Sequence, residues 1–240
     1  MSMGIRPLLL GHRGTRGEKS VAENTPAAFD FALASGCDGF EFDVRLSADG
    51  QAVICHDART TTRNKTGGIE IAQASALQLG LPLLRDVLTR YQPTAFLDIE
   101  LKVPGLETIT SDLLRRFAPV RGFVVSSFLP QVLEALHATE EPIPLGLICE
   151  TRAELNRWPQ LPVEYVIPHH KLLTRDLVQQ LKSAGKKILV WTVNIRADIK
   201  RLAQWEVDGI ISDHPKRLAL ILDRGRVPKT GMKTAIKNKD

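Results

Sequence analysis

Charged side chains stand two residues apart in two otherwise apolar segments of this chain. Glu41 and Asp43 lie within residues 39–46. Glu100 and Lys102 close a second apolar segment. Residues two apart on a β-strand share one face, so each pair would point in one direction. Burying so many charges is costly unless a cation or an anionic ligand joins them, so the two pairs predict a site of that kind.

A β-hairpin is expected to bring a histidine to these acidic residues. Only residues 47–50, Ser-Ala-Asp-Gly, separate the segment of Glu41 from a further apolar segment at 51–56. This turn signal is far too short for a parallel crossover, so the two segments should pair antiparallel. The return of the chain then places His56 opposite about Glu41 or Phe42.

Nine short apolar or β-branched runs are candidates for strands buried on both faces. They are residues 8–11, 39–46, 51–56, 95–101, 123–128, 145–149, 165–168, 187–193 and 209–212. Helices are expected from Thr25 to Gly36, from Thr174 to Gly185, and near residues 106–117, 130–138, 196–206 and 215–222. Threonine is a suitable amino-terminal cap, and glycine commonly ends a helix.

The order of these segments predicts an α/β fold, a TIM (β/α)8 barrel with a β-hairpin extension after the second strand and a short insertion. Without the returning arm of the hairpin, eight strands remain, and the later ones alternate with helices. A doubly wound open sheet is the structural alternative. In a barrel the functional site lies at the carboxyl ends of the strands. The polar residues at these ends are His12, Arg13, Glu41, Asp43, Glu100, Lys102, Ser126, His169, Trp191, Asn194 and Asp213.

Each of these features alone has an ordinary structural explanation. A His-Asp pair such as His56-Asp57 usually ends or caps a turn, and one Glu-x-Asp on a strand is usually a solvated face. A functional site is favoured because independent segments place acids, histidines and cations at the same rim.

Short motifs spread over residues 8–222 occur in an order that indicates one family. They are Gly11-His12-Arg13-Gly14, Glu23-Asn24-Thr25 with Ala28-Phe29, Gly39 to Val44, Asp49-Gly50 with Val53 to Asp57, Glu100-Leu101-Lys102, Trp191 to Asn194, and Gly209 to Pro215. Each motif is weak alone, but their order and spacing together are specific. On these residues the chain resembles the glycerophosphodiester phosphodiesterase family, which belongs to the PLC-like phosphodiesterase superfamily.

The resemblance implies a TIM barrel, a divalent metal ion on Glu41, Asp43 and Glu100, and catalysis by His12 and His56. Ligation by carboxylates alone suits a hard ion, Mg²⁺ or Ca²⁺. We take His12 as the general base and His56 as the acid for the departing alcohol. The expected reaction is metal-dependent hydrolysis of glycerophosphodiesters to an alcohol and glycerol 3-phosphate. The attacking oxygen is either water or the glycerol 2-hydroxyl group.

Substrate contacts follow from the same resemblance. It implies phosphate contacts from Arg13 and Lys102, and Trp191 is expected to pack against the glycerol carbons. The chain departs from the family at Ala22, where proline is usual, and in the segment 59–81, which is short. In the family this segment covers part of the active-site mouth, so a lysophospholipase D or phospholipase C-like activity is an alternative. A non-catalytic phosphodiester-binding protein is a further one.

The distribution of net charge along the chain limits the classes of partner that we expect. Of the net charge of +5, residues 223–240 carry +4, since they hold six basic and two acidic residues. The remaining +1 on residues 1–222 gives little reason to bind nucleic acid. We expect one domain over residues 1–222, a basic disordered tail over 223–240, and a small glycerophosphodiester as the partner. The sequence does not specify an oligomeric state.

The sequence carries no signal for a membrane. No apolar run approaches about 18 residues, so neither a membrane-spanning helix nor stable membrane association is expected. The apolar start is too short for the core of a signal peptide, which favours a cytoplasmic location. Cys37, Cys55 and Cys149 are widely spaced in apolar contexts, so we expect buried thiols without a metal or redox role.

Overall fold

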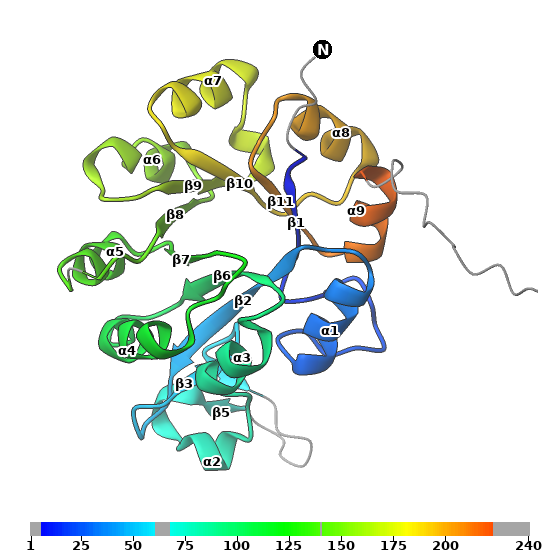
Figure 1. Ribbon diagram of the computed structural model, residues 1–240. Helices are drawn as coiled ribbons and strands as arrows, with labels where there is room; N and C mark the ends of the chain where they lie inside the picture. The colour runs from blue at the N-terminus through cyan, green and yellow to red at the C-terminus, as the bar shows by residue number, and fades with distance from the viewer. Residues whose placement is uncertain (1–5, 61–67, 140, 223–240) are drawn as a thin grey trace, which may run out of the picture.

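Eight parallel strands form a closed barrel in the computed structural model, which describes residues 6–60, 68–139 and 141–222. Within these residues each strand pairs with the next around the barrel, and β1 also pairs with β2 and closes it (Figure 1). The barrel strands are β1 (Leu8–Gly11), β2 (Gly39–Leu46), β6 (Phe96–Leu101), β7 (Phe123–Ser127), β8 (Leu145–Cys149), β9 (Tyr165–Pro168), β10 (Lys187–Val190) and β11 (Gly209–Ser212). The predicted TIM barrel is confirmed, and closure excludes the open sheet.

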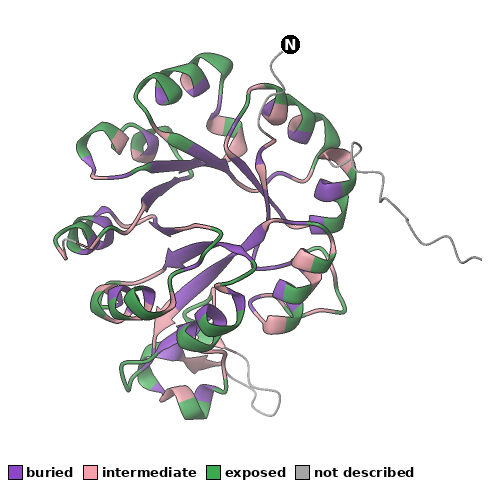
Figure 2. Cartoon of the chain, viewed as in Figure 1, coloured by how far each residue is buried: buried purple, intermediate pink, exposed green. Residues whose placement is uncertain are grey.

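Burial on both faces explains why these strands read as apolar runs. Alternate residues point into the barrel, where side chains of β1 and of β6 to β11 form one core. The other face packs against the helices in a larger core. Figure 2 shows the strands buried along most of their length while the helices expose their outer faces. A barrel filled in this way leaves only its ends for polar side chains.

Helices cover the outside of the barrel. They are α1 (Pro26–Ala34), α2 (Ala76–Leu79), α3 (Leu84–Tyr91), α4 (Glu107–Phe117), α5 (Pro130–His137), α6 (Arg152–Leu155), α7 (Arg175–Ser183), α8 (Arg196–Gln204) and α9 (Pro215–Leu222), with 3₁₀ turns at Ile71–Gln73, Trp158–Gln160 and His170–Leu172. The predicted caps are confirmed, since the Thr25 and Thr174 side chains accept backbone N–H groups. We did not predict α3, because Leu83 precedes it without a capping side chain.

The hairpin after β2 has the expected register. Val44 faces Ile54 across the antiparallel pair of β2 and β3 (Ala52–Ile54). Continuing that register places His56 opposite Phe42, as predicted. Beyond it, β4 (Arg59–Thr60) and β5 (Ile69–Glu70) form a separate two-stranded sheet. With α2 they make up the short insertion, which has a small core of its own beside the barrel.

Three further expectations concern the periphery. The predicted tail, residues 223–240, lies outside the described residues. In the part of the chain that the structure describes, no helix combines the length and the apolar character needed to cross a bilayer. Cys37 and Cys149 are buried as expected, but Cys55 is only half-buried, because it follows the last residue of β3 at the barrel rim.

Candidate active site

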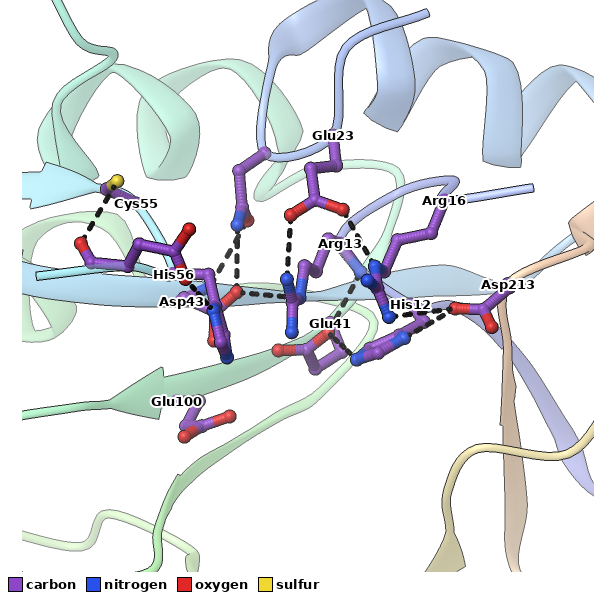
Figure 3. Close-up of polar contacts among 12 residues, drawn as sticks. His12, Arg13, Arg16, Glu23, Glu41, Asp43, Cys55, His56, Glu100 and Asp213 are labelled. Atoms are coloured by element: carbon purple, nitrogen blue, oxygen red, sulfur yellow. Dashed lines mark hydrogen bonds and ion pairs between the residues drawn. The ribbon is translucent and has the colours of Figure 1, made fainter. Parts of the chain in front are cut away.

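The barrel strands and the hairpin bring the predicted site residues to one cavity of about 300 Å³. It is lined by His12, Arg13, Glu41, His56, Glu100, Lys102 and Trp191. Asp43 lies just behind this wall with 1% of its side chain exposed. Residues far apart in the sequence therefore meet at the carboxyl end of the barrel, where β1, β2 and β6 end (Figure 3).

Three carboxylates converge inside this cavity wall. Glu41, Asp43 and Glu100 each offer one oxygen, and these oxygens lie within 4.8 Å of one another. Among the described residues the buried Glu41 Oε1 accepts no hydrogen bond. Asp43 Oδ1 and Glu100 Oε1 meet only the ammonium group of Lys102. Buried oxygens left in this state fit a hard divalent cation.

The surroundings of the three carboxylates shift their pKa values in different directions. Burial and the neighbouring carboxylate of Asp43 raise the pKa of Glu100 to about 7, although Lys102 opposes the rise. Burial and the charge of Asp43 also raise the pKa of Glu41. Burial acts against ionised Asp43 too, but Lys102 and Arg13 outweigh it and hold its pKa below the usual range. Without a metal, the cluster therefore favours bound protons over three adjacent negative charges.

Two cations compensate the ionised member of this cluster. Lys102 Nζ lies 2.6 Å from Glu100 Oε1 and 3.3 Å from Asp43 Oδ1. Arg13 Nε lies 3.2 Å from Asp43 Oδ2, and Arg13 Nη1 donates to Glu23 Oε1 at 2.7 Å. Arg13 has a φ of 50°, in the left-handed region, and its N–H donates to Glu41 Oε2. The chain thus turns sharply after β1 to aim both the backbone and the side chain of one residue at the acids.

His12 is held by a carboxylate from the other end of the sequence. Its Nδ1 lies 2.7 Å from Asp213 Oδ1, and its Nε2 faces Glu41 Oε2 at 3.8 Å. Asn194 donates to the second Asp213 oxygen at 2.6 Å. Burial acts against the ionised Asp213, but these hydrogen bonds lower its pKa to about 2. An ionised Asp213 fixes the ring proton on Nδ1 and leaves Nε2 free toward the cavity.

His56 also has an aspartate partner, but this aspartate is exposed to solvent. Its Nδ1 lies 2.7 Å from Asp57 Oδ1, but 78% of the Asp57 side chain is exposed. Burial lowers the pKa of His56, while Asp43 and Asp57 act in the opposite direction. Both histidines line the same cavity, each with an aspartate at Nδ1, and Glu41 lies between them (Figure 3).

Trp191 forms part of the apolar wall of the cavity. Its Nε1 donates to the Ile167 carbonyl at 2.9 Å, and its ring packs edge to face against Phe128. His169, also named at a strand end, does not line the cavity. Its Nδ1 accepts from the Lys171 N–H, and its ring supports Trp191, which is a structural role.

Sequence reasoning gave no role to several residues that the structure brings to the site. Asp213 was named only as a polar strand end, and its contact with His12 spans 201 positions. Asp98 also lines the cavity, and burial raises its pKa to about 7 although Ser126 donates to it. The signal for Asp98 was present, because it stands two residues before Glu100 and shares its face. Glu150 lines the cavity as well.

Comparison with known proteins agrees with this geometry. The model of the "Glycerophosphoryl diester phosphodiesterase family" matches residues 12–217. A glycerophosphodiester phosphodiesterase of Caldanaerobacter subterraneus subsp. tengcongensis is 28% identical, over 92% of this chain and 100% of the relative. A putative one of Bacillus subtilis is 30% identical, over 86% and 94%. A solved Oleispira antarctica phosphodiesterase, in complex with the product sn-glycerol-3-phosphate, is 26% identical with a TM-score of 0.78 and covers 91% and 97%.

Proposed function

Because this chain belongs to the glycerophosphoryl diester phosphodiesterase family, we propose that it hydrolyses glycerophosphodiesters with two histidines and a divalent metal ion. The protein is an enzyme, a phosphoric diester hydrolase like these relatives. The products would be an alcohol and glycerol 3-phosphate. The observation that carries the proposal is one cavity lined by two histidines, Glu41 and Glu100, with Asp43 directly behind its wall.

Glu41, Asp43 and Glu100 would hold the metal ion. Their carboxylate oxygens suit Mg²⁺ or Ca²⁺, because hard cations prefer oxygen ligands. When bound, such an ion neutralises phosphoryl oxygens and activates an oxygen nucleophile. The cation would also pair Asp43 Oδ1 and Glu100 Oε1, which now meet only Lys102, and this would offset the cost of burying the cluster.

His12 would act as the general base. Asp213 keeps the proton on Nδ1, so Nε2 is the nitrogen that accepts a proton from the attacking hydroxyl group. The same carboxylate stabilises the imidazolium ion that forms. This assignment holds whether the attacking oxygen is water or the glycerol 2-hydroxyl group.

His56 would act as the general acid for the departing alcohol. It lines the same cavity as His12, with Glu41 between the two rings. Burial lowers its pKa in the free protein and so disfavours the protonated form that donates a proton. The negative charge of a bound diester would favour that protonated form, because an opposite charge stabilises it.

Arg13 and Lys102 would hold the phosphate. Both cations line the cavity beside the carboxylates. Charge-assisted hydrogen bonds from such groups stabilise the charge that develops on the phosphoryl oxygens. Trp191 would cover the glycerol carbons, since its ring forms part of the apolar wall.

A turnover assay with glycerophosphocholine tests the proposal. We expect EDTA-treated protein to be inactive and Mg²⁺ or Ca²⁺ to restore hydrolysis. The variant Glu41→Gln should need far more metal, while Glu134→Gln, on the exposed face of α5, should behave as wild type. Lysophosphatidylcholine and phosphatidylinositol assayed in parallel test the alternatives. Full turnover by a verified metal-free preparation would contradict the metal role, and faster turnover of the lipids would contradict the substrate.

A further inference from the structure

Arg45 is a half-buried cation near the site to which the proposed chemistry gives no role. It lies on β2 two residues after Asp43 and pairs with Val53 in the antiparallel ladder of the hairpin. Its side chain reaches along the returning arm, where Nε donates to the carbonyl oxygen of His56 at 2.7 Å. Within residues 6–60, 68–139 and 141–222, the guanidinium group forms no ion pair, so this hydrogen bond is the contact that holds it.

Regular backbone pairing of the returning arm stops just before His56. The Cys55 N–H donates to the Asp43 carbonyl at 3.0 Å. The next backbone hydrogen bond along the chain, in the part that the structure describes, joins the Ala58 carbonyl to the Ile71 N–H in the insertion. Over the same described residues His56 itself takes part in no backbone–backbone hydrogen bond. The main chain that carries the imidazole ring is therefore held by a side chain, that of Arg45.

The other contact of His56 is a weaker anchor. Asp57 pairs with the ring at Nδ1, but 78% of the Asp57 side chain is exposed, and exposed pairs fix geometry poorly. The bond from Arg45 has a charged donor and is half-buried, which makes it stronger than a bond between neutral groups. The hydrogen bond from His56 holds the pKa of Asp57 below its usual range, and the charge of Arg45 adds to this effect. The guanidinium group thus lies close to both residues of the His-Asp pair.

We propose that Arg45 is a positioning residue, which holds the main chain of His56 and so keeps its ring in place for proton donation. This rests on the proposed function, in which His56 is the general acid. A general acid must lie within hydrogen-bond reach of the leaving oxygen, and a misplacement of about 1 Å can cost about a hundredfold in rate. Arg45 lines a separate cavity of about 320 Å³ between the hairpin, the insertion and the loop after β6. It therefore acts through His56 and does not touch the substrate.

Two substitutions separate the hydrogen-bond donor of Arg45 from the bulk of its side chain. Arg45→Met keeps an unbranched stem and removes every donor, whereas Arg45→Lys keeps the charge and an ammonium donor without the planar guanidinium group. Arg59→Met is the matched control. Arg59 lies on β4 of the insertion, and its guanidinium group donates to Glu70 and to the Gly68 carbonyl. Thermal melts establish that each variant is folded.

The leaving group shows whether Arg45 serves proton donation. We expect Arg45→Met to lower kcat on glycerophosphocholine about ten- to a hundredfold and to leave KM nearly unchanged. On the p-nitrophenyl diester of glycerol 3-phosphate, which hardly needs a general acid, the same variant should stay within about threefold of wild type. Arg45→Lys should recover part of the loss, and Arg59→Met should behave as wild type. Equal losses on both diesters, or no loss, would overturn the inference, because damage to the fold or the metal site does not depend on the leaving group.

A double variant tests whether the effect of Arg45 passes through His56. Once the imidazole ring is absent, holding its main chain brings no further gain in rate. Arg45→Met combined with His56→Ala should therefore turn over glycerophosphocholine within about twofold of His56→Ala alone. Losses that multiply in the double variant would show that Arg45 acts on another part of the site, and they would overturn the inference.

Amide hydrogen exchange of the metal-loaded full-length protein tests the positioning without turnover. Peptides that contain Cys55, whose N–H makes the last ladder bond, should exchange faster in Arg45→Met than in the wild type or Arg59→Met, while peptides of β1 and β6 should not change. Unchanged exchange at Cys55 would overturn the inference.

The exchange and turnover measurements together separate the two proposals. If exchange responds as expected but the wild type does not turn over glycerophosphocholine, the proposed function fails and the anchoring of His56 by Arg45 stands. If the wild type is active and His56→Ala is not, but Arg45→Met matches the wild type in both measurements, the inference fails alone.

Discussion

At the scale of residues, the two histidines carry the same contact in different surroundings. Each has an aspartate 2.7 Å from Nδ1, Asp213 for His12 and Asp57 for His56. The Asp213 side chain is 19% exposed and the Asp57 side chain 78%. Water can replace an exposed hydrogen-bond partner, but it cannot easily reproduce a buried carboxylate that is itself held in place.

The two aspartates should therefore differ in their effect on turnover. We expect Asp213→Asn to lower kcat by about two to four orders of magnitude, because an amide no longer fixes the tautomer of His12 or stabilises its charged form. Asp57→Asn should stay within about tenfold of wild type. Steady-state kinetics on glycerophosphocholine measures both. Equal losses in the two variants would show that burial of the partner does not matter here.

The histidines themselves should each be essential. His12→Ala and His56→Ala should lower turnover by about two to four orders of magnitude while the proteins remain folded, which is the usual scale for a general acid or base. The double variant should cost less than the product of the single effects, since groups that act as a unit are not additive. Near-normal activity of His56→Ala on a natural glycerophosphodiester would contradict its role.

The leaving group distinguishes the acid from the base. p-Nitrophenolate departs without a proton, so a diester with this leaving group hardly needs a general acid. Turnover of that diester should partly recover in His56→Ala and should not recover in His12→Ala. Recovery in His12→Ala alone would exchange the two assignments.

At the scale of elements, the two-residue period of the strands and the length of the hairpin turn predicted most of the barrel strands and the hairpin. The strands read as apolar runs because both of their faces are buried, and the spacing of Glu41 and Asp43 set their shared face. The four-residue turn set the register of the hairpin to within one residue at His56. Contacts between residues far apart in the sequence had no such local signal. The contact of Asp213 with His12 depends on β11 lying beside β1, which only closure of the barrel decides.

Register at β2 should depend on the absence of a side chain at Gly39. A Cβ there would lie 1.8 Å from the Phe96 carbonyl oxygen on β6. We expect Gly39→Ala to force the strands apart and lower the free energy of unfolding by about 3 kcal/mol. Gly185 is the control, since its φ of 73° is left-handed but its surroundings are open, and Gly185→Ala should cost about 1 kcal/mol. Denaturant unfolding measures both, and a mild effect at Gly39 would contradict the packing argument.

At the scale of the whole molecule, the barrel gathers buried charge at one end. A scaffold filled with apolar side chains supports a mouth where four carboxylates face two cations. The carboxylates are Glu41, Asp43, Asp98 and Glu100, and the cations are Arg13 and Lys102. Taken alone, that imbalance destabilises the fold, and a bound metal ion would relieve it. The stability of the fold should therefore depend on the state of this site even when no substrate is present.

The pH dependence of stability follows from the raised pKa values. Asp98 and Glu100 have pKa values of about 7 in the folded protein, against ordinary values of 3.8 and 4.5. Between about pH 4 and 7 the folded protein thus binds more protons than the unfolded chain, and the free energy of unfolding falls as the pH rises through that window. The lowered pKa of His56 has the opposite effect on the free energy of unfolding. It involves one proton, whereas the carboxylates involve at least two.

The melting temperature of the chelated protein should accordingly fall between pH 5.5 and pH 8. Mg²⁺ or Ca²⁺ should raise it strongly at pH 8 and little at pH 5.5, because metal ions bind deprotonated carboxylates. Differential scanning calorimetry with and without the metal measures this. In Glu100→Gln, which cannot ionise at that position, both the fall with pH and the gain from metal should shrink. A melting temperature that rises over this range in EDTA, or a metal effect equal at both pH values, would show that the carboxylates do not hold protons in place of a cation.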